Sequence, residues 1–353
     1  MNKKTRKFYP KMKSITSMTR LFFNSACIIA SICFLLNDIA YAKDKLRPSL
    51  MFNKIKKEHS ATLSITEGAG YRPSRAFGET GLRFFPLGIG TAWFGRPWPT
   101  DNVSYTDPSP EDIEQHLDQA FEIMANGEGI VMIDAAAAYG YTEERIGTYF
   151  KKKPDLLRKA FISTKWGEDF DLSNGKSSHN YSAAHLIFSV DRSLKNLGKI
   201  DLLYMHGTGE RNKVLGALQD GGVIKEMKDM KTSRNIKYLG VSISNADILE
   251  VALEKDLLKD FEAVQISIEI YLLRPELVDR LFEQGKAIVV NSPIRKGKKI
   301  LPDKSEREIY ELLLEDYRVI TLTGTRHHLK ETAGYVEASE DRLAELTRIR
   351  QWL

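Results

Sequence analysis

Four residues of chemically active types lie at or near the ends of three successive apolar runs. Asp134 ends the second run, Lys165 the third and His206 the fourth. Tyr139 follows Asp134 by five residues, in the loop that leads to the next helix. Reduction of a carbonyl by hydride needs a proton donor for the developing alkoxide. A tyrosine hydroxyl titrates near ~10, and a close ammonium favours its ionised form. We therefore predict that Tyr139 is the proton donor of a carbonyl reduction.

The other three residues have roles that fit beside this tyrosine. Lys165 would lower the pKa of Tyr139, and Asp134 would pair with Lys165 and hold it in place. His206 would orient the substrate oxygen by a hydrogen bond. Each residue alone has a simpler interpretation, as a packing tyrosine, a solvated lysine and a histidine that caps a backbone carbonyl. Their occurrence on adjacent strands favours the shared chemical role.

Eight short apolar runs separated by amphipathic stretches must position these residues. The runs, predicted as strands, are 85–90, 129–134, 160–165, 200–206, 236–241, 263–268, 287–291 and 319–322. Helices are predicted at 110–126, 183–197, 213–230, 246–258, 274–284 and 304–315. Buried strands that alternate with single helices favour a closed (β/α)8 TIM barrel, in which catalytic groups lie at the carboxyl ends of the strands. An open doubly wound sheet is the alternative, but Gly88-Ile-Gly90 lacks the third glycine of a dinucleotide-binding fingerprint.

The barrel domain is predicted to span residues 75–353. An N-terminal β-hairpin over residues 75–83, with its turn at 78–81, precedes the first strand, and an extra C-terminal helix at 339–352 would pack outside the barrel. Residues 43–74 are polar with little periodicity, which indicates a linker or arm.

The barrel domain carries no electrostatic signal for nucleic-acid binding. The chain has a net charge of +5, but residues 1–42 hold seven cations and one anion, so that residues 43–353 sum to −1. A near-neutral domain does not attract a phosphate backbone. Both cysteines, Cys27 and Cys33, also lie in residues 1–42. Disulfides and cysteine-based metal sites are therefore excluded from the rest of the chain.

Residues 1–42 have the features of a targeting leader. The apolar run 21–36 follows a cationic stretch, and the small residues of segment 40–42 suit a signal peptidase. The run is slightly short for a spanning helix, but it could contact or anchor in a membrane if it stays uncleaved. The chain would then be exported or membrane-anchored. If translation instead starts at Met12, Met18 or Met51, the protein would be cytoplasmic.

Several segments of the chain resemble the motifs of the aldo-keto reductase family. These segments are 78–82, 88–91, 133–147, 161–167, 189–206, 238–242, 264–265 and 323–326. They occur in the expected order and extend from residue 75 to about residue 340. The resemblance implies a (β/α)8 barrel that moves hydride between NADPH and a small carbonyl compound. It also implies the catalytic tetrad Asp134, Tyr139, Lys165 and His206.

The same resemblance implies a set of contacts to the cofactor. These residues are Thr91, Ser242, Gln265, Ser292, Gly324, Arg326, Lys330 and Glu331. Ser242 and Gln265 would hold the nicotinamide carboxamide, and Ser292 would lie beside the pyrophosphate. Arg326 or Lys330 could pair with a 2′-phosphate, which favours NADP, although NAD could also bind. The simpler interpretation of these two cations is a solvated helix face.

The clearest departure from the family pattern is at the nicotinamide. Asn291 stands where an aromatic ring commonly stacks on the nicotinamide face, so that cofactor affinity is in question. At the same rim, four aromatic residues are predicted either to line a substrate pocket or to cover the barrel mouth; they are Trp93, Phe94, Trp98 and Trp166.

Two other functions compete with carbonyl reduction. A metal-dependent barrel hydrolase would need clustered histidine and acidic ligands, and the adjacent pair His327-His328 does not suit one metal ion; we expect no metal. A nucleotide-binding regulatory protein with little turnover would fit the altered nicotinamide surroundings. The intact tetrad favours the enzyme.

Overall fold

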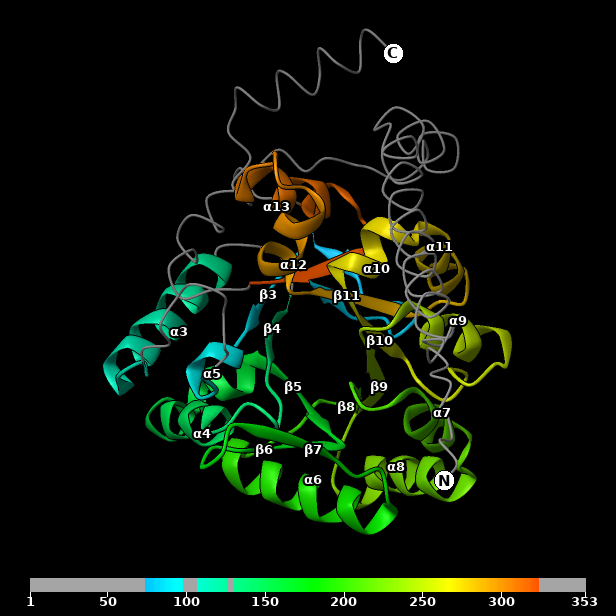
Figure 1. Ribbon diagram of the computed structural model, residues 1–353. Helices are drawn as coiled ribbons and strands as arrows, with labels where there is room; N and C mark the ends of the chain where they lie inside the picture. Colours follow the sequence, from blue (N-terminus) through cyan, green and yellow to red (C-terminus); the bar gives the residue numbers. More distant parts are fainter. Residues whose placement is uncertain (1–73, 98–106, 126–129, 324–353) are drawn as a thin grey trace, which may run out of the picture. The chain divides into compact units, whose positions relative to one another are not determined.

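Eight parallel strands close into a barrel. The computed structural model describes residues 74–97, 107–125 and 130–323, and Figure 1 shows helices arranged around the ring of strands. The strands, in their order around the barrel, are β3 (Leu87–Gly90), β4 (Val131–Asp134), β5 (Ala160–Trp166), β8 (Leu202–Gly207), β9 (Tyr238–Ile243), β10 (Ala263–Ser267), β11 (Ala287–Asn291) and β12 (Val319–Leu322). β12 pairs with β3 and closes the ring. The predicted TIM barrel is confirmed.

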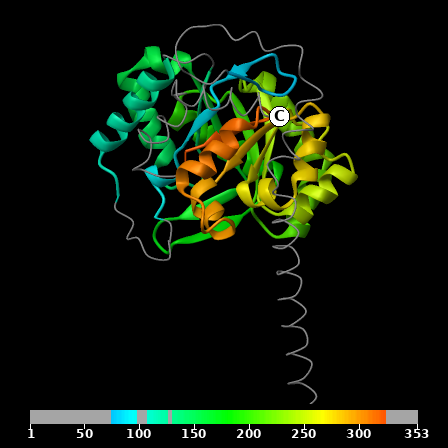
Figure 2. The same cartoon turned by 90° about the horizontal axis from the view of Figure 1, so that it is seen from above.

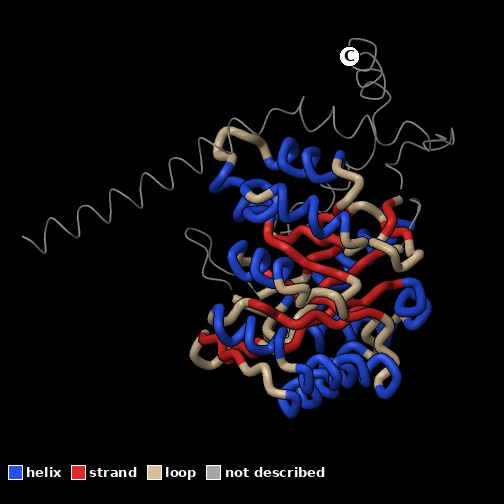
Figure 3. Tube along the Cα trace, turned by 90° about the vertical axis from the view of Figure 1, so that its right-hand side faces the viewer, coloured by secondary structure: helices blue, strands red, loops and turns tan. Residues whose placement is uncertain are grey.

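Helices connect the strands on the outside of the barrel (Figure 3). They are α3 (Pro110–Ala125), α4 (Thr142–Lys152), α5 (Pro154–Lys159), α6 (Ala183–Leu197), α7 (Arg211–Gln219), α8 (Gly221–Ser233), α9 (Ala246–Glu254), α10 (Ile268–Leu273), α11 (Pro275–Glu283), α12 (Pro293–Ile300) and α13 (Glu306–Glu315), with a 3-10 turn η1 (Ala92–Phe94) after β3. The single helix predicted at 213–230 is two helices. Asp220 separates them, because its carboxylate accepts the first free N–H groups of α8.

Two hairpins lie at opposite ends of the barrel (Figure 2). The first, β1 (Arg75–Ala76) with β2 (Arg83–Phe84), confirms the hairpin predicted from the sequence. Its rings Phe77 and Phe84 are fully buried against Phe161 at the amino end of the barrel. The second, β6 (Glu168–Asp171) with β7 (Lys176–His179), follows β5 and was not predicted.

Alternation along the strands divides the barrel interior into two zones. Inward positions near the amino ends are apolar, as in the cluster that contains Met132, Phe161 and Tyr204. Two residues further along the strands, inward positions become polar at Asp134 and His206. Because successive side chains in a strand point to opposite faces, the polar zone is concentrated at the carboxyl ends.

The predicted leader and C-terminal helix lie outside the described residues, as does the apolar run 21–36. Within the ranges that the structure describes, no helix is long and apolar enough to cross a membrane.

The contact between α4 and α6 gives a test of the packing. A Cβ atom added to Gly147 would lie 1.7 Å from the carbonyl oxygen of Asn196. We expect Gly147→Ala to lower the free energy of unfolding by about 3 kcal/mol, because the two backbones must separate. Gly216, in α7, has open space around its Cα, so Gly216→Ala should instead raise stability by up to about 1 kcal/mol. Urea unfolding measures both, and equal midpoints for the two variants would contradict this packing.

Candidate active site

The structure brings Asp134, Tyr139, Lys165 and His206 together at the carboxyl end of the barrel. The Lys165 ammonium lies 2.6 Å from the Asp134 carboxylate and 4.9 Å from the centre of the Tyr139 ring. The Tyr139 and His206 rings are nearly perpendicular, with their centres 6.3 Å apart. The four side chains therefore converge from β4, the loop after it, β5 and β8.

Lys165 and Asp134 form a fully buried ion pair. The Lys165 side chain has no exposed surface, and its ammonium also donates to the carbonyl of Ala135 at 2.8 Å. The other oxygen of Asp134 accepts from Ser163 at 2.8 Å and from Gln265 at 3.0 Å. Burial acts to lower the pKa of Lys165, but Asp134 and Tyr139 outweigh it, so that this pKa lies above its ordinary value. A positive charge is thus fixed beneath the tyrosine.

The Tyr139 hydroxyl stays protonated at neutral pH. Burial raises the pKa of Tyr139 above its ordinary value, and the nearby Lys165 only partly offsets this shift. From the sequence, the pKa of Tyr139 was expected to be lowered. The sequence shows the nearby lysine, but it does not show how deeply the tyrosine ring is buried. The shift keeps the phenol protonated, as donation to an alkoxide requires.

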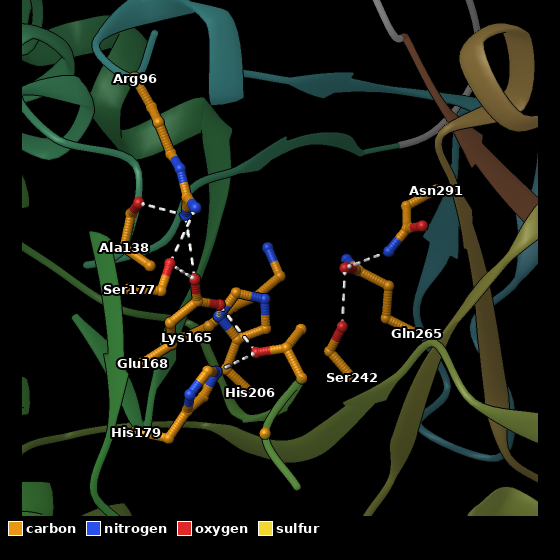
Figure 4. A network of polar contacts seen from close by, with 12 residues as sticks. Arg96, Ala138, Lys165, Glu168, Ser177, His179, His206, Ser242, Gln265 and Asn291 are labelled. Carbon is orange, nitrogen blue, oxygen red and sulfur yellow. Dashed lines mark hydrogen bonds and ion pairs between the residues drawn. The ribbon is translucent and has the colours of Figure 1, made fainter. Parts of the chain in front are cut away.

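A buried carboxylate, Glu168 at the start of β6, lies beside His206 (Figure 4). One oxygen accepts from Arg96 at 3.0 Å and from Ser177 at 2.7 Å. The other accepts from Thr208 at 2.7 Å and lies 3.1 Å from Nδ1 of His206. Sequence reasoning missed Glu168 and Arg96. The position of Glu168, three residues after Lys165, was the only available signal.

The residues predicted to hold the nicotinamide carboxamide form a chain of hydrogen bonds that reaches Asp134. Ser242 and Asn291 both donate to the side-chain oxygen of Gln265, at 3.1 and 3.0 Å. The amide nitrogen of Gln265 donates to Asp134 at 3.0 Å. Asn291 is half-buried, whereas Ser242 and Gln265 are buried. Asn291 thus covers part of the polar surface of Gln265 and replaces the expected ring with an amide (Figure 4).

Of the remaining predicted cofactor residues, Thr91 and Ser292 lie within the described part of the chain. Thr91 is buried, and its hydroxyl donates to the backbone carbonyl of Asp134 at 2.8 Å, so that it supports the end of β4. Ser292 precedes α12 in a left-handed conformation, with φ of 55°. Gly324, Arg326, Lys330 and Glu331 lie outside the described residues.

Two of the four predicted pocket aromatics pack in the core instead of at an open rim. Phe94 and Trp166 have no exposed surface. Trp166 follows the inward-facing Lys165, so it points outward to the helices. Trp93 is half-buried and packs edge-on against Phe94. Trp98 lies outside the described residues.

The described part of the chain contains no group of three histidine, cysteine or acidic side chains that could hold a metal ion. His327 and His328 lie outside it.

Comparisons with known proteins show a matching family model and two related proteins. The model of the Aldo/keto reductase family matches residues 86–311. Pyridoxal 4-dehydrogenase of Microbacterium luteolum is 28% identical over 268 residues, which cover 66% of this chain and 74% of that protein. The aldo-keto reductase yakc (NADP(+)) of Schizosaccharomyces pombe is 29% identical over 202 residues. The match spans 54% of each of these two chains.

Solved structures give a similar result. An aldo-keto reductase structure from Pseudomonas aeruginosa superposes with a TM-score of 0.60 at 27% identity, and the match covers 80% of this chain and all of that one. An aldo-keto reductase from Klebsiella pneumoniae, solved in complex with NADPH, has a TM-score of 0.54 at 17% identity, over 79% of this chain and 95% of that one. At that identity the second likeness concerns the fold alone.

Proposed function

Because the chain belongs to the aldo/keto reductase family of oxidoreductases, we propose that it reduces an aldehyde or ketone to an alcohol with NADPH and uses Tyr139 as the proton donor. The observation that carries this proposal is the buried Lys165–Asp134 pair held 4.9 Å from the centre of the Tyr139 ring. A solvated lysine at this position would be screened by water and would stabilise a charged Tyr139 only weakly. A buried ammonium stabilises negative charge on the phenol oxygen.

The side chains of this site account for the proton in the proposed reaction. Bound NADPH supplies the hydride that adds to the carbonyl carbon. As negative charge develops on the carbonyl oxygen, the Tyr139 hydroxyl gives its proton to that oxygen, and Lys165 stabilises the phenolate that remains. Asp134 keeps Lys165 in place. His206, whose side chain keeps 8% of its surface exposed, would orient the same oxygen by a hydrogen bond.

The residues at the ends of β9, β10 and β11 fit a nicotinamide carboxamide. Ser242, Gln265 and Asn291 together offer hydroxyl and amide groups that can both donate and accept hydrogen bonds. Ser292 opens α12, and a helix N-terminus favours an anionic pyrophosphate. The yeast relative has NADP(+) in its name. We propose NADP as the cofactor, with Arg326 and Lys330 at the 2′-phosphate and NAD as the weaker ligand.

The amide of Asn291 should make NADPH binding weaker than an aromatic ring would. We expect Asn291→Tyr to lower the Kd for NADPH by about fivefold to tenfold, because stacked rings contribute roughly 1 kcal/mol. Asn291→Ala is the matched control, since it removes the amide without adding a ring, and it should not tighten binding. Fluorescence titration of the full chain with NADPH gives both values. A weaker Asn291→Tyr complex would show that no ring can stack at this position.

The full chain, NADPH and a set of carbonyl compounds test the proposed activity. The set should contain benzaldehyde, acetophenone and pyridoxal, because pyridoxal is in the name of the Microbacterium relative. We expect carbonyl-dependent loss of NADPH absorbance with an equal amount of alcohol formed. NADPH binding without turnover on any carbonyl would favour the second candidate, a nucleotide-binding regulatory protein. The observation in favour of that candidate is that the side-chain oxygen of Gln265 already accepts two hydrogen bonds within the protein, and its amide nitrogen already donates one to Asp134.

A further inference from the structure

We propose that Arg96 is a positioning residue for the proton donor: its guanidinium holds the loop that carries Tyr139 against the β6–β7 hairpin and thereby fixes the phenol near Lys165. This loop, called the Tyr139 loop below, is segment 135–141 between β4 and α4. Arg96 would act through Tyr139 and set the rate without changing which cofactor binds. The inference rests on the proposed function, because Tyr139 is the proton donor of that reaction.

The guanidinium of Arg96 joins three segments of the chain at the carboxyl rim of the barrel (Figure 4). One nitrogen donates to the backbone carbonyl of Ala138 at 2.9 Å and to the carboxylate of Glu168 at 3.0 Å. The other terminal nitrogen donates to the Ser177 hydroxyl at 2.9 Å. Ala138 directly precedes Tyr139, while Glu168 and Ser177 lie on the two strands of the hairpin. One side chain from the segment after β3 therefore connects the Tyr139 loop to the hairpin.

These contacts of Arg96 lie out of water. The side chains of Arg96 and Glu168 expose 9% and 7% of their surface, and the guanidinium lies over the ring of Phe170 in the hairpin, 4.1 Å from its centre. Charge-assisted hydrogen bonds that are excluded from water are stronger than exposed ones. A planar guanidinium presents its donors in a rigid fork, whereas a lysine ammonium is a compact point charge without that fork. The arrangement therefore needs an arginine and not merely a cation.

The backbone next to Arg96 also lies against the Tyr139 loop. The N–H of Tyr141 donates to the carbonyl of Gly95 at 3.4 Å. A Cβ atom added to Gly140, where φ is 60°, would lie 2.1 Å from that same carbonyl oxygen. Only a residue without a side chain allows so close an approach at this position. The backbone contact thus places Arg96 where its guanidinium reaches the carbonyl before Tyr139.

The position of this loop decides how well the Tyr139 phenol is shielded from water. Burial is the largest cause that raises the pKa of Tyr139, Lys165 is the largest that lowers it, and the charges of Asp134 and Glu168 raise it further. A loosened loop would admit water, while the Lys165 ammonium would stay paired with Asp134. The pKa of Tyr139 should then fall toward its ordinary value. A displacement of the hydroxyl by about 1 Å can also lower the reaction rate by about 100-fold.

Arg96→Lys tests these contacts without leaving a buried carboxylate unpaired. The lysine keeps a positive charge beside Glu168 but lacks the planar fork. We expect the single-turnover rate of benzaldehyde reduction by the full chain to fall at least about tenfold. The Kd for NADPH should stay within about twofold, because the proposed carboxamide contacts Ser242 and Gln265 lie on other strands.

Arg318→Lys is the matched control at the opposite end of the barrel. Arg318 directly precedes β12, its side chain is also 9% exposed, and its guanidinium donates twice to the buried carboxylate of Asp316. The same substitution removes an equivalent fork, so urea unfolding should show similar losses of stability for the two variants. Arg318→Lys should leave the single-turnover rate within about twofold. If the two variants lose the same fraction of the rate, Arg96 serves the fold alone and the inference is wrong.

Carbon NMR of the full chain, labelled at the Cζ atom of tyrosine, follows the phenol without turnover. Tyr139→Phe assigns the Tyr139 signal by its absence. We expect the pKa of Tyr139 to lie above its ordinary value in the unmodified chain and in Arg318→Lys, and to be lower in Arg96→Lys. A loss of global stability alone does not move this titration. An unchanged Tyr139 titration in folded Arg96→Lys would overturn the inference.

Hydrogen exchange in the unmodified chain gives a reading that does not depend on any variant folding. The backbone N–H groups of Ala137, Tyr139 and Tyr141 all donate to carbonyls within the protein. We expect the Tyr139 loop to exchange more slowly than the exposed turn 172–175 of the hairpin. Exchange of the loop at the rate of that turn would show that Arg96 does not hold it.

The outcomes separate this inference from the proposed function. If the unmodified chain reduces carbonyls and Arg96→Lys matches Arg318→Lys in rate and in the Tyr139 titration, only the role of Arg96 is wrong. If the chain reduces no carbonyl, the proposed function fails, while the titration and the hydrogen exchange still decide whether Arg96 fixes Tyr139.

Discussion

Tyr139→Phe is expected to lower kcat/KM for carbonyl reduction by about 100-fold to 10,000-fold, which is the usual contribution of a positioned proton donor. The ring would stay in place, 6.3 Å from His206, while the proton for the alkoxide is lost. Because burial holds the pKa of Tyr139 above its ordinary value, the hydroxyl is protonated throughout the neutral range. The reduction rate of the unmodified chain should therefore be level there and fall only in alkali, where the hydroxyl ionises.

Tyr141→Phe is the control for this prediction. Tyr141 lies two residues further along the same loop, and 51% of its surface is exposed. Its hydroxyl can be removed without touching the site, so we expect activity within about twofold of the unmodified chain, as for most surface substitutions. NADPH titration and thermal unfolding should show both variants bound and folded. Tyr139→Phe activity above a tenth of the starting value would show that another group supplies the proton.

Lys165→Met is expected to have the largest effect on stability as well as a large effect on activity. The substitution leaves the Asp134 carboxylate buried without its cation, which typically costs about 3–5 kcal/mol. It also removes the charge that stabilises the phenolate of Tyr139, so kcat should fall by at least about 100-fold. Urea unfolding and NADPH oxidation measure the two losses separately.

The double variant Asp134→Asn with Lys165→Met distinguishes the loss of stability from the loss of activity. It removes both charges of the pair, and replacing a whole buried ion pair is often close to neutral. We expect it to regain most of the stability lost in Lys165→Met while remaining inactive, a coupling that a double-mutant cycle reports directly. Additive destabilisation would mean that the charges of Asp134 and Lys165 do not stabilise each other, and recovered activity would contradict the role of Lys165.

The barrel and the convergence of the four central residues could be predicted, because both depend on the local pattern of apolar and polar residues along the chain. Asp134, Lys165 and His206 each end an apolar run, and in a closed parallel barrel all such ends meet at one rim. The roles assigned to these residues and to the cofactor contacts stay predictions until the variants are measured.

Contacts made by the segments that connect the barrel strands could not be predicted from the sequence. Glu168 is charged and follows a strand, which in sequence resembles a solvated loop; only the β6–β7 hairpin turns it toward His206. Arg96 reaches it across 72 positions of the chain. The pocket assignment of Trp166 overlooked the alternation of side chains, since a residue next to the inward-facing Lys165 must point outward. The pKa direction of Tyr139 likewise depended on burial.

Deuterium transfer is the most direct test of hydride transfer by this chain. The full chain is incubated with benzaldehyde and NADPH that carries deuterium at C4, separately on each face, and the alcohol is analysed by mass spectrometry. We predict one deuterium at the carbinol carbon from one of the two labelled cofactors, and none from the other. Bound NADPH that leaves the aldehyde unreduced, or an alcohol free of deuterium from both cofactors, would contradict the account.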